Sequence, residues 1–333
     1  MKKILVTGGC GYIGSHFVSV LDPKDYEVYI VDNLMNSNSN VIENIKQINP
    51  IKITFIKRNI QDPKALKDLF SLNKFYAVIH FAGLKSVSDS IINPVKYYEN
   101  NFLGSLNLIK VMLEFNVNKI IFSSSATVYG NINMQPVTEE GSINPINPYG
   151  QTKHMVESLL KSICNSNKNF RAICLRYFNP IGAHRSGKLG EVITNLSPNV
   201  MPSILNAIKN KTYFKIYGNS YATSDGTCIR DYIHVIDLVN AHLFTLNKIN
   251  KLERFDVFNV GTGNPISVLQ LLKKFSDLNK LNIKYKYANE RLGDVAVSYA
   301  NVSKINNIIG WRSQLDINDM CIDSWNWFKP NSK

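Results

Sequence analysis

Near the N-terminus the chain reads ILVTGGCGYIGSHFVSVL over residues 4–21. The apolar run at residues 4–7 predicts a buried strand and the stretch from Tyr12 predicts a helix, so Gly8, Gly11 and Gly14 fall between the two and in the first helical turn. A turn without side chains lets a pyrophosphate approach the backbone N–H groups at a helix N-terminus. Glycines also cluster in ordinary turns, but this position between a strand and a helix indicates a dinucleotide-binding loop.

The first half of the chain alternates short apolar runs with helical patterns. This order predicts an α/β fold with a doubly wound parallel sheet, the Rossmann arrangement, whose strands are covered on both faces and therefore read as near-continuous apolar runs. Proline opens three of the expected helices, where its missing N–H costs nothing. The expected strands are residues 4–7, 28–31, 54–57, 77–80, 119–123 and 171–176, and the expected helices are residues 12–21, 41–47, 63–70, 94–115 and 148–164.

Length and pattern together predict two domains. A chain of 333 residues exceeds the usual size of a single core. Beyond about residue 179 the pattern loosens into connections rich in Gly, Pro and Asn. We therefore expect a dinucleotide-binding domain at residues 1–178 and a smaller, mixed α/β substrate domain at residues 179–333, with some later segments returning to the first domain.

Composition excludes several classes of protein. The hydrophobic fraction is 44%, the charged fraction is 19%, and no apolar run is long enough to cross a bilayer. The apolar stretch at the N-terminus is too short for a signal peptide, so we expect a cytoplasmic protein without a membrane partner. The five cysteines show no CxxC spacing, which argues against a disulfide framework and against a metal site.

The net charge of +13 suits an anionic ligand that carries a pyrophosphate, and nucleic acid is the alternative. The lysines are scattered, and they accompany many asparagines and isoleucines, a bias that a low-GC genome also produces. We favour the compositional explanation and expect no nucleic-acid partner.

Asp32 follows the second expected strand, 18 residues beyond Gly14. At this separation an acid accepts hydrogen bonds from the ribose hydroxyls of the adenosine, and its charge repels a 2′-phosphate. A solvated loop acid is the alternative, but the glycine loop upstream favours the ribose role. The sequence therefore predicts NAD rather than NADP.

Tyr149 and Lys153 form a YxxxK pair on one face of an expected helix. Oxidation of an alcohol requires a base, and a nearby ammonium group lowers the high pKa of a phenol. Ser125, at the end of the fifth expected strand, can bond the same substrate oxygen or the phenol. A lone YxxxK is more often a surface feature, but with the serine and the glycine loop it indicates a catalytic group.

Nine motifs in this order span nearly all of the chain and resemble the UDP-glucose/UDP-galactose 4-epimerase family of the extended short-chain dehydrogenase/reductase superfamily. They are VTGGCGYIGSH, VDNLMNS, HFAGLKSV, YYENN, FSSSATVYG, PYGQTK, LRYFNPIGAH, GTCIRDYIHV and FNVGTG. The resemblance implies an enzyme of galactose metabolism, an isomerase that interconverts the two UDP-sugars through a 4-keto intermediate with transient hydride transfer to bound NAD.

The resemblance also implies site residues, with Ser125, Tyr149 and Lys153 as the catalytic set. Together with the glycines of the loop, the implied NAD contacts are Gly8, Gly11, Tyr12, Ile13, Gly14, Asp32, Asn33, Leu34, Met35, Asn36, Ser37, Asn59, Ile60, Phe81, Ala82, Gly83, Leu84, Lys85, Asn100, Ser125, Tyr149, Lys153 and Phe178. The implied UDP-sugar contacts are Lys85, Ser125, Tyr149, Asn179, Asn199, Val200, Lys215, Ile216, Tyr217, Arg230, Arg291, Asp294 and Ser298.

Two positions qualify this picture. Asn59 stands where the family has an aspartate, so its side-chain oxygen can accept from the adenine amino group only without a charge. Ser298 matches the family's gatekeeper beside the sugar, where a small residue also admits N-acetylated sugars, so we expect turnover of UDP-GlcNAc and UDP-GalNAc as well. A register slip of one residue would place Tyr299 there instead.

The resemblance further implies a homodimer formed by the helices that start at Pro94 and Pro148. Apolar positions beyond what one sheet face covers agree with it, namely Leu103, Leu106, Ile109, Met155 and Leu159, although packing within one chain would use the same residues. Two other functions compete with epimerisation. A related dehydratase needs acids directly after the strand-end serine, where this chain has Ala126 and Thr127, and a nonenzymatic NAD-binding protein would not need Ser125, Tyr149 and Lys153 together.

Overall fold

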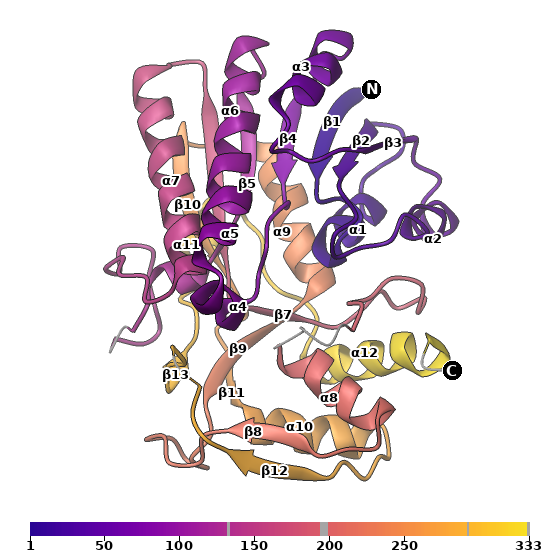
Figure 1. Ribbon diagram of the computed structural model, residues 1–333, viewed down its shortest axis with the longest axis vertical. Coiled ribbons are helices and arrows are strands. Elements are labelled where there is room, and N and C mark those ends of the chain that lie inside the picture. The colour runs from indigo at the N-terminus through magenta and orange to yellow at the C-terminus, as the bar shows by residue number, and fades with distance from the viewer. Residues whose placement is uncertain (132–133, 194–198, 292, 332–333) are drawn as a thin grey trace.

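The computed structural model describes residues 1–131, 134–193, 199–291 and 293–331. Seven parallel strands form the large sheet in the order β10-β6-β5-β4-β1-β2-β3 (Figure 1). The strand order reverses between β1 and β4, and ligands of such sheets bind at the carboxyl ends of the strands beside this reversal. The predicted doubly wound parallel sheet is thus confirmed. Its strands are β1 Lys2–Thr7, β2 Tyr26–Asp32, β3 Ile53–Lys57, β4 Ala77–His80, β5 Lys119–Ser125, β6 Arg171–Tyr177 and β10 Phe255–Val260.

Helices cover both faces of this sheet. Side chains alternate along β1, so Ile4 and Val6 pack into one buried cluster while Leu5 packs into the other. The first cluster is closed by α1 (Tyr12–Ser19), α2 (Val41–Ile48), α9 (Val235–Lys248) and α11 (Ser303–Ile308). The second is closed by α3 (Pro63–Leu72), α6 (Gly104–Glu114) and α7 (Pro148–Ser166).

The helix expected at residues 94–115 is observed from Pro94 to Glu114, but it is not α-helical throughout. The structure has α5 (Pro94–Tyr97), a π-helix (Tyr98–Leu103) and then α6, preceded by α4 (Val87–Ile92), which the sequence pattern did not predict. Asn101 lies in this π-helix, and its side chain bonds both backbone groups of Leu84. It accepts from the N–H at 2.7 Å and donates to the carbonyl oxygen at 3.0 Å. A long-range bond of this kind leaves no periodic signal. The other expected elements differ from the observed ones by a few residues at their ends.

The second half of the chain builds two small sheets (Figure 1). β9 (Ile229–His234) is paired with β7 (Asn179–Ile181), β11 (Pro265–Ser267) and β13 (Val297–Ser298), and β8 (Phe214–Tyr217) is paired with β12 (Tyr285–Ala288). The helices here are α8 (Val200–Lys209), α10 (Val268–Leu278) and α12 (Ile317–Asn331). α9, β10 and α11 follow residue 179 in the sequence, but they pack with the large sheet, so the later part of the chain returns to the first half. The division into two domains at residue 179 stays a prediction.

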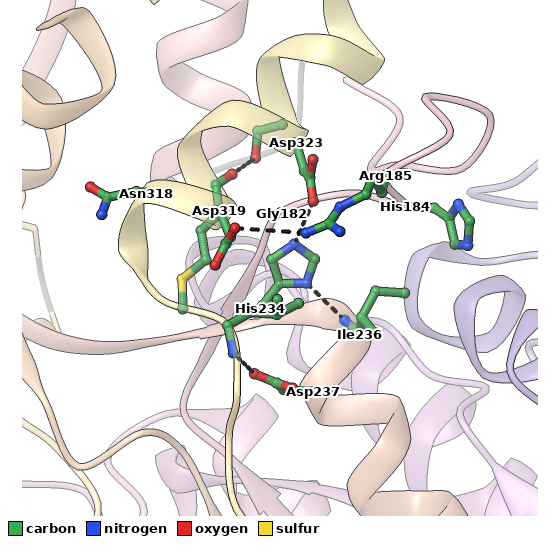
Figure 2. A network of polar contacts seen from close by, with 12 residues as sticks. Gly182, His184, Arg185, His234, Ile236, Asp237, Asn318, Asp319 and Asp323 are labelled. Atoms are coloured by element: carbon green, nitrogen blue, oxygen red, sulfur yellow. Dashed lines mark hydrogen bonds and ion pairs between the residues drawn. The ribbon is translucent and has the colours of Figure 1, made fainter. Parts of the chain in front are cut away.

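A buried polar network ties α12 to the junction of β9 and α9 (Figure 2). His234 Nδ1 accepts from the Ile236 N–H at 3.1 Å, which caps α9, and its Nε2 lies 3.4 Å from Asp323 of α12. Arg185, from the segment after β7, lies 3.9 Å from Asp319 on the same helix. The C-terminal helix is therefore held against the strands that follow Phe178. No helix in the described ranges is long and apolar enough to cross a membrane.

Candidate active site

The glycine loop leaves the N-terminus of α1 accessible. Gly8 has φ +69°, a conformation that disfavours other residues, and a Cβ at this position would lie 2.7 Å from the Ala82 nitrogen. A Cβ on Gly14 would lie 2.3 Å from the Gly8 carbonyl oxygen. Gly11 begins the helix and caps it with no side chain. The free N–H groups of the first turn can therefore receive a phosphate.

Asp32 is the last residue of β2, and its carboxylate holds two loops together. It accepts from the Cys10 N–H at 3.0 Å, from the Leu34 N–H at 2.8 Å and from the Ser37 hydroxyl at 3.0 Å. These bonds fix the glycine loop relative to the loop that follows β2. A carboxylate has about four lone-pair sites, so one remains for a further donor.

An open cleft lies along the carboxyl ends of β1 to β4. Most of the residues predicted to contact the cofactor line it, while Val31 and Arg58 were not predicted. Its lining is Gly8, Gly11, Val31, Asp32, Asn33, Met35, Asn36, Ser37, Arg58, Asn59, Ile60, Phe81, Ala82, Gly83, Leu84 and Asn100.

Asn59 uses its side chain locally. Its oxygen accepts from the Gln61 N–H at 3.0 Å, and its amide nitrogen donates to the Gln61 side chain at 2.9 Å. An amide oxygen has a second lone pair, so the adenine contact suggested for Asn59 is compatible with this geometry. Arg58 places a cationic side chain beside it in the same cleft. The only signal in the sequence was its position directly after a strand, which surface arginines share.

Ser125, Tyr149 and Lys153 meet where β5 ends and α7 begins. Asn147 caps α7 by accepting from the Gly150 N–H at 2.8 Å, and Pro148 opens the helix, so Tyr149 lies in its first turn. Lys153 lies one turn later, with its ammonium group 5.8 Å from the centre of the Tyr149 ring. Its Nζ donates to the Ser123 carbonyl oxygen at 2.6 Å, two residues before Ser125. The structure thus brings the three predicted catalytic residues together.

Burial is the main cause of the pKa shifts of Tyr149 and Lys153. It raises the pKa of Tyr149, and a side-chain hydrogen bond with Ser125 acts in the opposite direction. Burial lowers the pKa of Lys153 to about 8, while the charge of Glu157 raises it. An ammonium group with a pKa near neutrality can change its charge during a reaction, and such perturbed groups are typical of catalytic sites.

Several of the predicted sugar-binding residues lie on the small sheets or in the loop between β12 and β13. The Arg291 guanidinium stacks on the Tyr217 ring at 3.6 Å, and Arg230 lies 3.8 Å from Asp294. Ser298 is paired with Arg230 across β13 and β9. Ile216 is 1% exposed and packs in the core of the second half, so only its backbone is available to a ligand.

Glu191 connects the two halves of the site and was not predicted. It forms an ion pair with Lys85, and it accepts from the Asn199 side chain at 3.5 Å. Lys85 in turn lies 6.0 Å from the centre of the Tyr12 ring, at the start of α1. Glu191 and Lys85 therefore bring together Tyr12 at the start of α1 and Asn199 just before α8. No motif marked Glu191, because its partners are distant in the sequence.

Comparison with known proteins agrees with this arrangement. Residues 4–261 match the model described as "NAD dependent epimerase/dehydratase family". The chain belongs to this family. It is 41% identical over 332 residues to the UDP-glucose 4-epimerase of Bacillus subtilis. The aligned region covers 98% of this chain and 97% of that protein.

Two solved structures extend the similarity. The UDP-glucose-4-epimerase of Stenotrophomonas maltophila with bound NAD and formylated UDP-arabinopyranose has a TM-score of 0.96 and 38% identity, with 100% of this chain and 99% of that chain covered. The UDP-Glc/GlcNAc 4-epimerase of Campylobacter jejuni has a TM-score of 0.85 and 36% identity, with 99% and 100% covered.

The residues of this epimerase-family chain fit the family's cofactor. The bare helix N-terminus suits a pyrophosphate, and the positions of Gly8 and Gly14 leave no space for side chains that would block it. Asp32, 9% exposed at the edge of the cleft, suits a ribose rather than a 2′-phosphate. The cleft leads along the strand ends toward Gly83, and a Cβ on this glycine would lie 3.8 Å from Lys153 Nζ.

Proposed function

We propose that this protein is an NAD-dependent UDP-glucose 4-epimerase that interconverts UDP-galactose and UDP-glucose. The observation that carries the proposal is the meeting of Ser125, Tyr149 and Lys153 at the end of β5, beside the cleft that starts at the glycine loop. The similarity to UDP-glucose 4-epimerases over nearly the whole chain supports it.

The chemistry follows from the groups present. Tyr149 removes the proton of the C4 hydroxyl and later returns it, and bound NAD supplies the reversible acceptance of hydride from C4. The Lys153 ammonium group favours the phenolate form of Tyr149, and Ser125 donates a hydrogen bond to the C4 oxygen. Since the 4-keto sugar can present either face to the same groups, one proton carrier serves both epimers.

We assign the UDP part of the substrate to the small sheets. Arg230 and Arg291 offer cationic groups for the two phosphates, with Asp294 and Tyr217 holding their guanidinium groups. We also assign substrate contacts to Lys85, Asn179 and Asn199. Asn179 starts β7 directly after Phe178, and Lys85 and Asn199 both contact Glu191.

We also propose turnover of the N-acetylated pair. Ser298 is small and half-buried, and it lies opposite Arg230. Tyr299 is held by its backbone, which donates to the Gln135 side chain at 3.0 Å and accepts from the Val137 N–H at 2.9 Å. β13 ends at Ser298, and the bonds of the Tyr299 backbone belong to the segment at residues 135–137, so we assign the position beside the sugar to Ser298.

The homodimer is part of the same proposal. Leu103 in the π-helix is 43% exposed, and Val95 on α5 is 68% exposed, so this side of the molecule offers apolar groups to a second copy. Ile109 does not contribute, since it is 1% exposed and packs in the core beneath the sheet. Met155 and Leu159 on α7 are half-buried.

The test is a conversion assay. Purified protein is mixed with UDP-galactose without added reductant, and the sugar nucleotides are separated. An epimerase produces UDP-glucose until both sugars are at equilibrium, with no accumulation of free NADH. A dehydratase would instead release a 4-keto-6-deoxy product, and a binding protein would release nothing, so either of those results would reject the proposal.

A further inference from the structure

The face of α7 that carries Tyr149 and Lys153 continues to Glu157, because the three residues are spaced four apart. This helix packs against β5 and β6. Glu157 is 3% exposed and Lys153 is 5% exposed. A buried carboxylate is costly unless it is paired, and the proposed chemistry gives Glu157 no direct contact with the sugar.

Glu157 and Lys153 hold consecutive residues of β5. Lys153 Nζ donates to the Ser123 carbonyl oxygen at 2.6 Å, and the Ser124 hydroxyl donates to Glu157 Oε1 at 2.5 Å. The next residue is Ser125. The helix that positions Tyr149 therefore also fixes the strand end from which Ser125 projects.

Arg176 completes the set from the neighbouring strand. It is paired with Ser124 across β6 and β5, and its guanidinium binds Glu157 through both oxygens, at 3.0 and 2.7 Å. Arg176 Nη1 also donates to the Tyr129 hydroxyl at 2.9 Å. The Glu157 carboxylate is thereby fixed in orientation. A buried ion pair adds little net stability compared with apolar residues of similar size. The role of Glu157 is therefore to be sought in the position and the charge of its carboxylate.

The ionisable groups that act on Lys153 are Tyr149 and Glu157 from α7, His80 from β4 and Cys174 from β6. Arg176 from β6 joins this set through its ion pair with Glu157. Burial lowers the pKa of His80 to about 3 and raises the pKa of Cys174 well above its usual value, so both are neutral at pH 7. Among these described groups, Glu157 supplies the negative charge. Burial lowers the pKa of Lys153 to about 8, and Glu157 opposes that effect.

We propose that Glu157 is a positioning residue of the reaction, whose carboxylate keeps Lys153 a cation beside Tyr149 and holds the end of β5 where Ser125 meets the sugar. The inference rests on the proposed function. Without the carboxylate, Lys153 loses its proton at a lower pH and no longer favours the phenolate of Tyr149. Without the bond to Ser124, the serine hydroxyl loses its fixed geometry.

The test of the charge is Glu157→Gln. Lys153 is titrated directly by ¹³C NMR on lysine-labelled protein, with its signal assigned by its loss in Lys153→Arg. Removal of a nearby opposite charge lowers the midpoint of Lys153 by about 1 pH unit. The alkaline limb of kcat with UDP-galactose moves to lower pH by a similar amount, because the cationic fraction of Lys153 falls earlier as the pH rises.

Two further variants leave every charged residue in place. They distinguish the effect of the Glu157 charge on Lys153 from the effect of Glu157 on the position of β5. Tyr129→Phe removes the hydrogen bond on the far side of Arg176, and we expect the Lys153 midpoint and the alkaline limb to stay where they are. Ser124→Ala removes the bond to Glu157, and we expect kcat to fall about tenfold with an unchanged Lys153 midpoint. A purely structural role of Glu157 would instead lower kcat at every pH without moving either midpoint.

An unchanged Lys153 midpoint in folded Glu157→Gln overturns the proposal. If that variant does not fold, Glu157→Asp replaces it. Its carboxylate is one methylene shorter, so we expect a lower kcat and a smaller shift of the Lys153 midpoint in the same direction, and no change in either again overturns the proposal. The NMR titration does not depend on turnover, so a wild type without epimerase activity would reject the proposed function while Glu157 is still tested.

Discussion

The proposed proton-handling centre and the proposed sugar-binding face of this molecule are built in opposite ways. Lys153, Glu157 and Arg176 are buried, and each is held by partners on β5, β6 or α7. Beside the small sheets the charges are more open. The side chain of Asp294, in the loop before β13, is 34% exposed and lies 3.8 Å from Arg230, whose side chain is 14% exposed. Arg291 stacks there on the ring of Tyr217.

The difference follows from what each region has to do. A proton transfer depends on fixed charges and dipoles that need no reorganisation at the moment of reaction, which a buried and fully bonded group provides. Recognition of a sugar nucleotide needs cations that reach its phosphates and a surface that admits different sugars. We therefore expect substitutions in the first region to change turnover, and substitutions in the second to change which sugar is turned over and how tightly it binds.

The largest effect is expected for Tyr149→Phe. This variant keeps the ring and removes the hydroxyl that carries the proton, so kcat with UDP-galactose should fall by at least ~10²-fold. Folding and NAD binding should be retained, which circular dichroism and NAD titration would show. Near-normal turnover would assign the proton transfer to another group, and the region around Lys153 would then not be the proton-handling centre.

Ser298→Tyr should separate the two substrate pairs. A phenol ring beside the sugar overlaps with an N-acetyl group at C2 but not with a hydroxyl group, so kcat/KM for UDP-GlcNAc should fall by about tenfold or more, the scale of a steric rejection in a pocket. The value for UDP-galactose should change little. Ser298→Ala is the matched control and should retain both activities. Retention of the acetylated activity in Ser298→Tyr would show that another residue limits the pocket.

A smaller effect is expected for Arg291→Met, which keeps much of the apolar stem and removes the charge. Loss of one charge-assisted hydrogen bond of about 1.5 kcal/mol corresponds to about a tenfold higher KM for UDP-galactose. kcat should be nearly unchanged, since this contact is equal in the ground and transition states. Arg312→Met, at an exposed position outside the site, is the control. A fall in kcat instead would place Arg291 in the chemical step.

The sequence was most informative where a residue type acts through local spacing. The glycine loop, the YxxxK pair and the strand-end serine depend on neighbours within a few residues, and the structure joins them as expected. β4 was predicted with its observed bounds, because both faces of its four residues are buried and the run is purely local.

Long-range partners were the part that could not be predicted. Glu157 looked like one of many helical glutamates, and only the fold brings Arg176 and Ser124 to it. Glu191 meets Lys85 across 106 residues. β10 joins β6 after the chain has left the large sheet and returned, which no pattern within β10 indicates.

The smallest effect on turnover is expected at the proposed dimer interface. Leu103→Glu places a charge at a 43% exposed apolar position of the π-helix, and it should shift the species seen by light scattering from twice the 37.7 kDa chain mass to the single chain. Since Leu103 is not among the residues of the cleft, kcat should change by less than about threefold, below the effect expected of a lost catalytic contact. Leu72→Glu, at an 81% exposed leucine of α3, is the matched control and should leave the mass unchanged. A fully active wild type of single-chain mass would remove the dimer from the proposal, and a large loss of turnover in Leu103→Glu would mean that the interface supports α7 and its proton-handling residues directly.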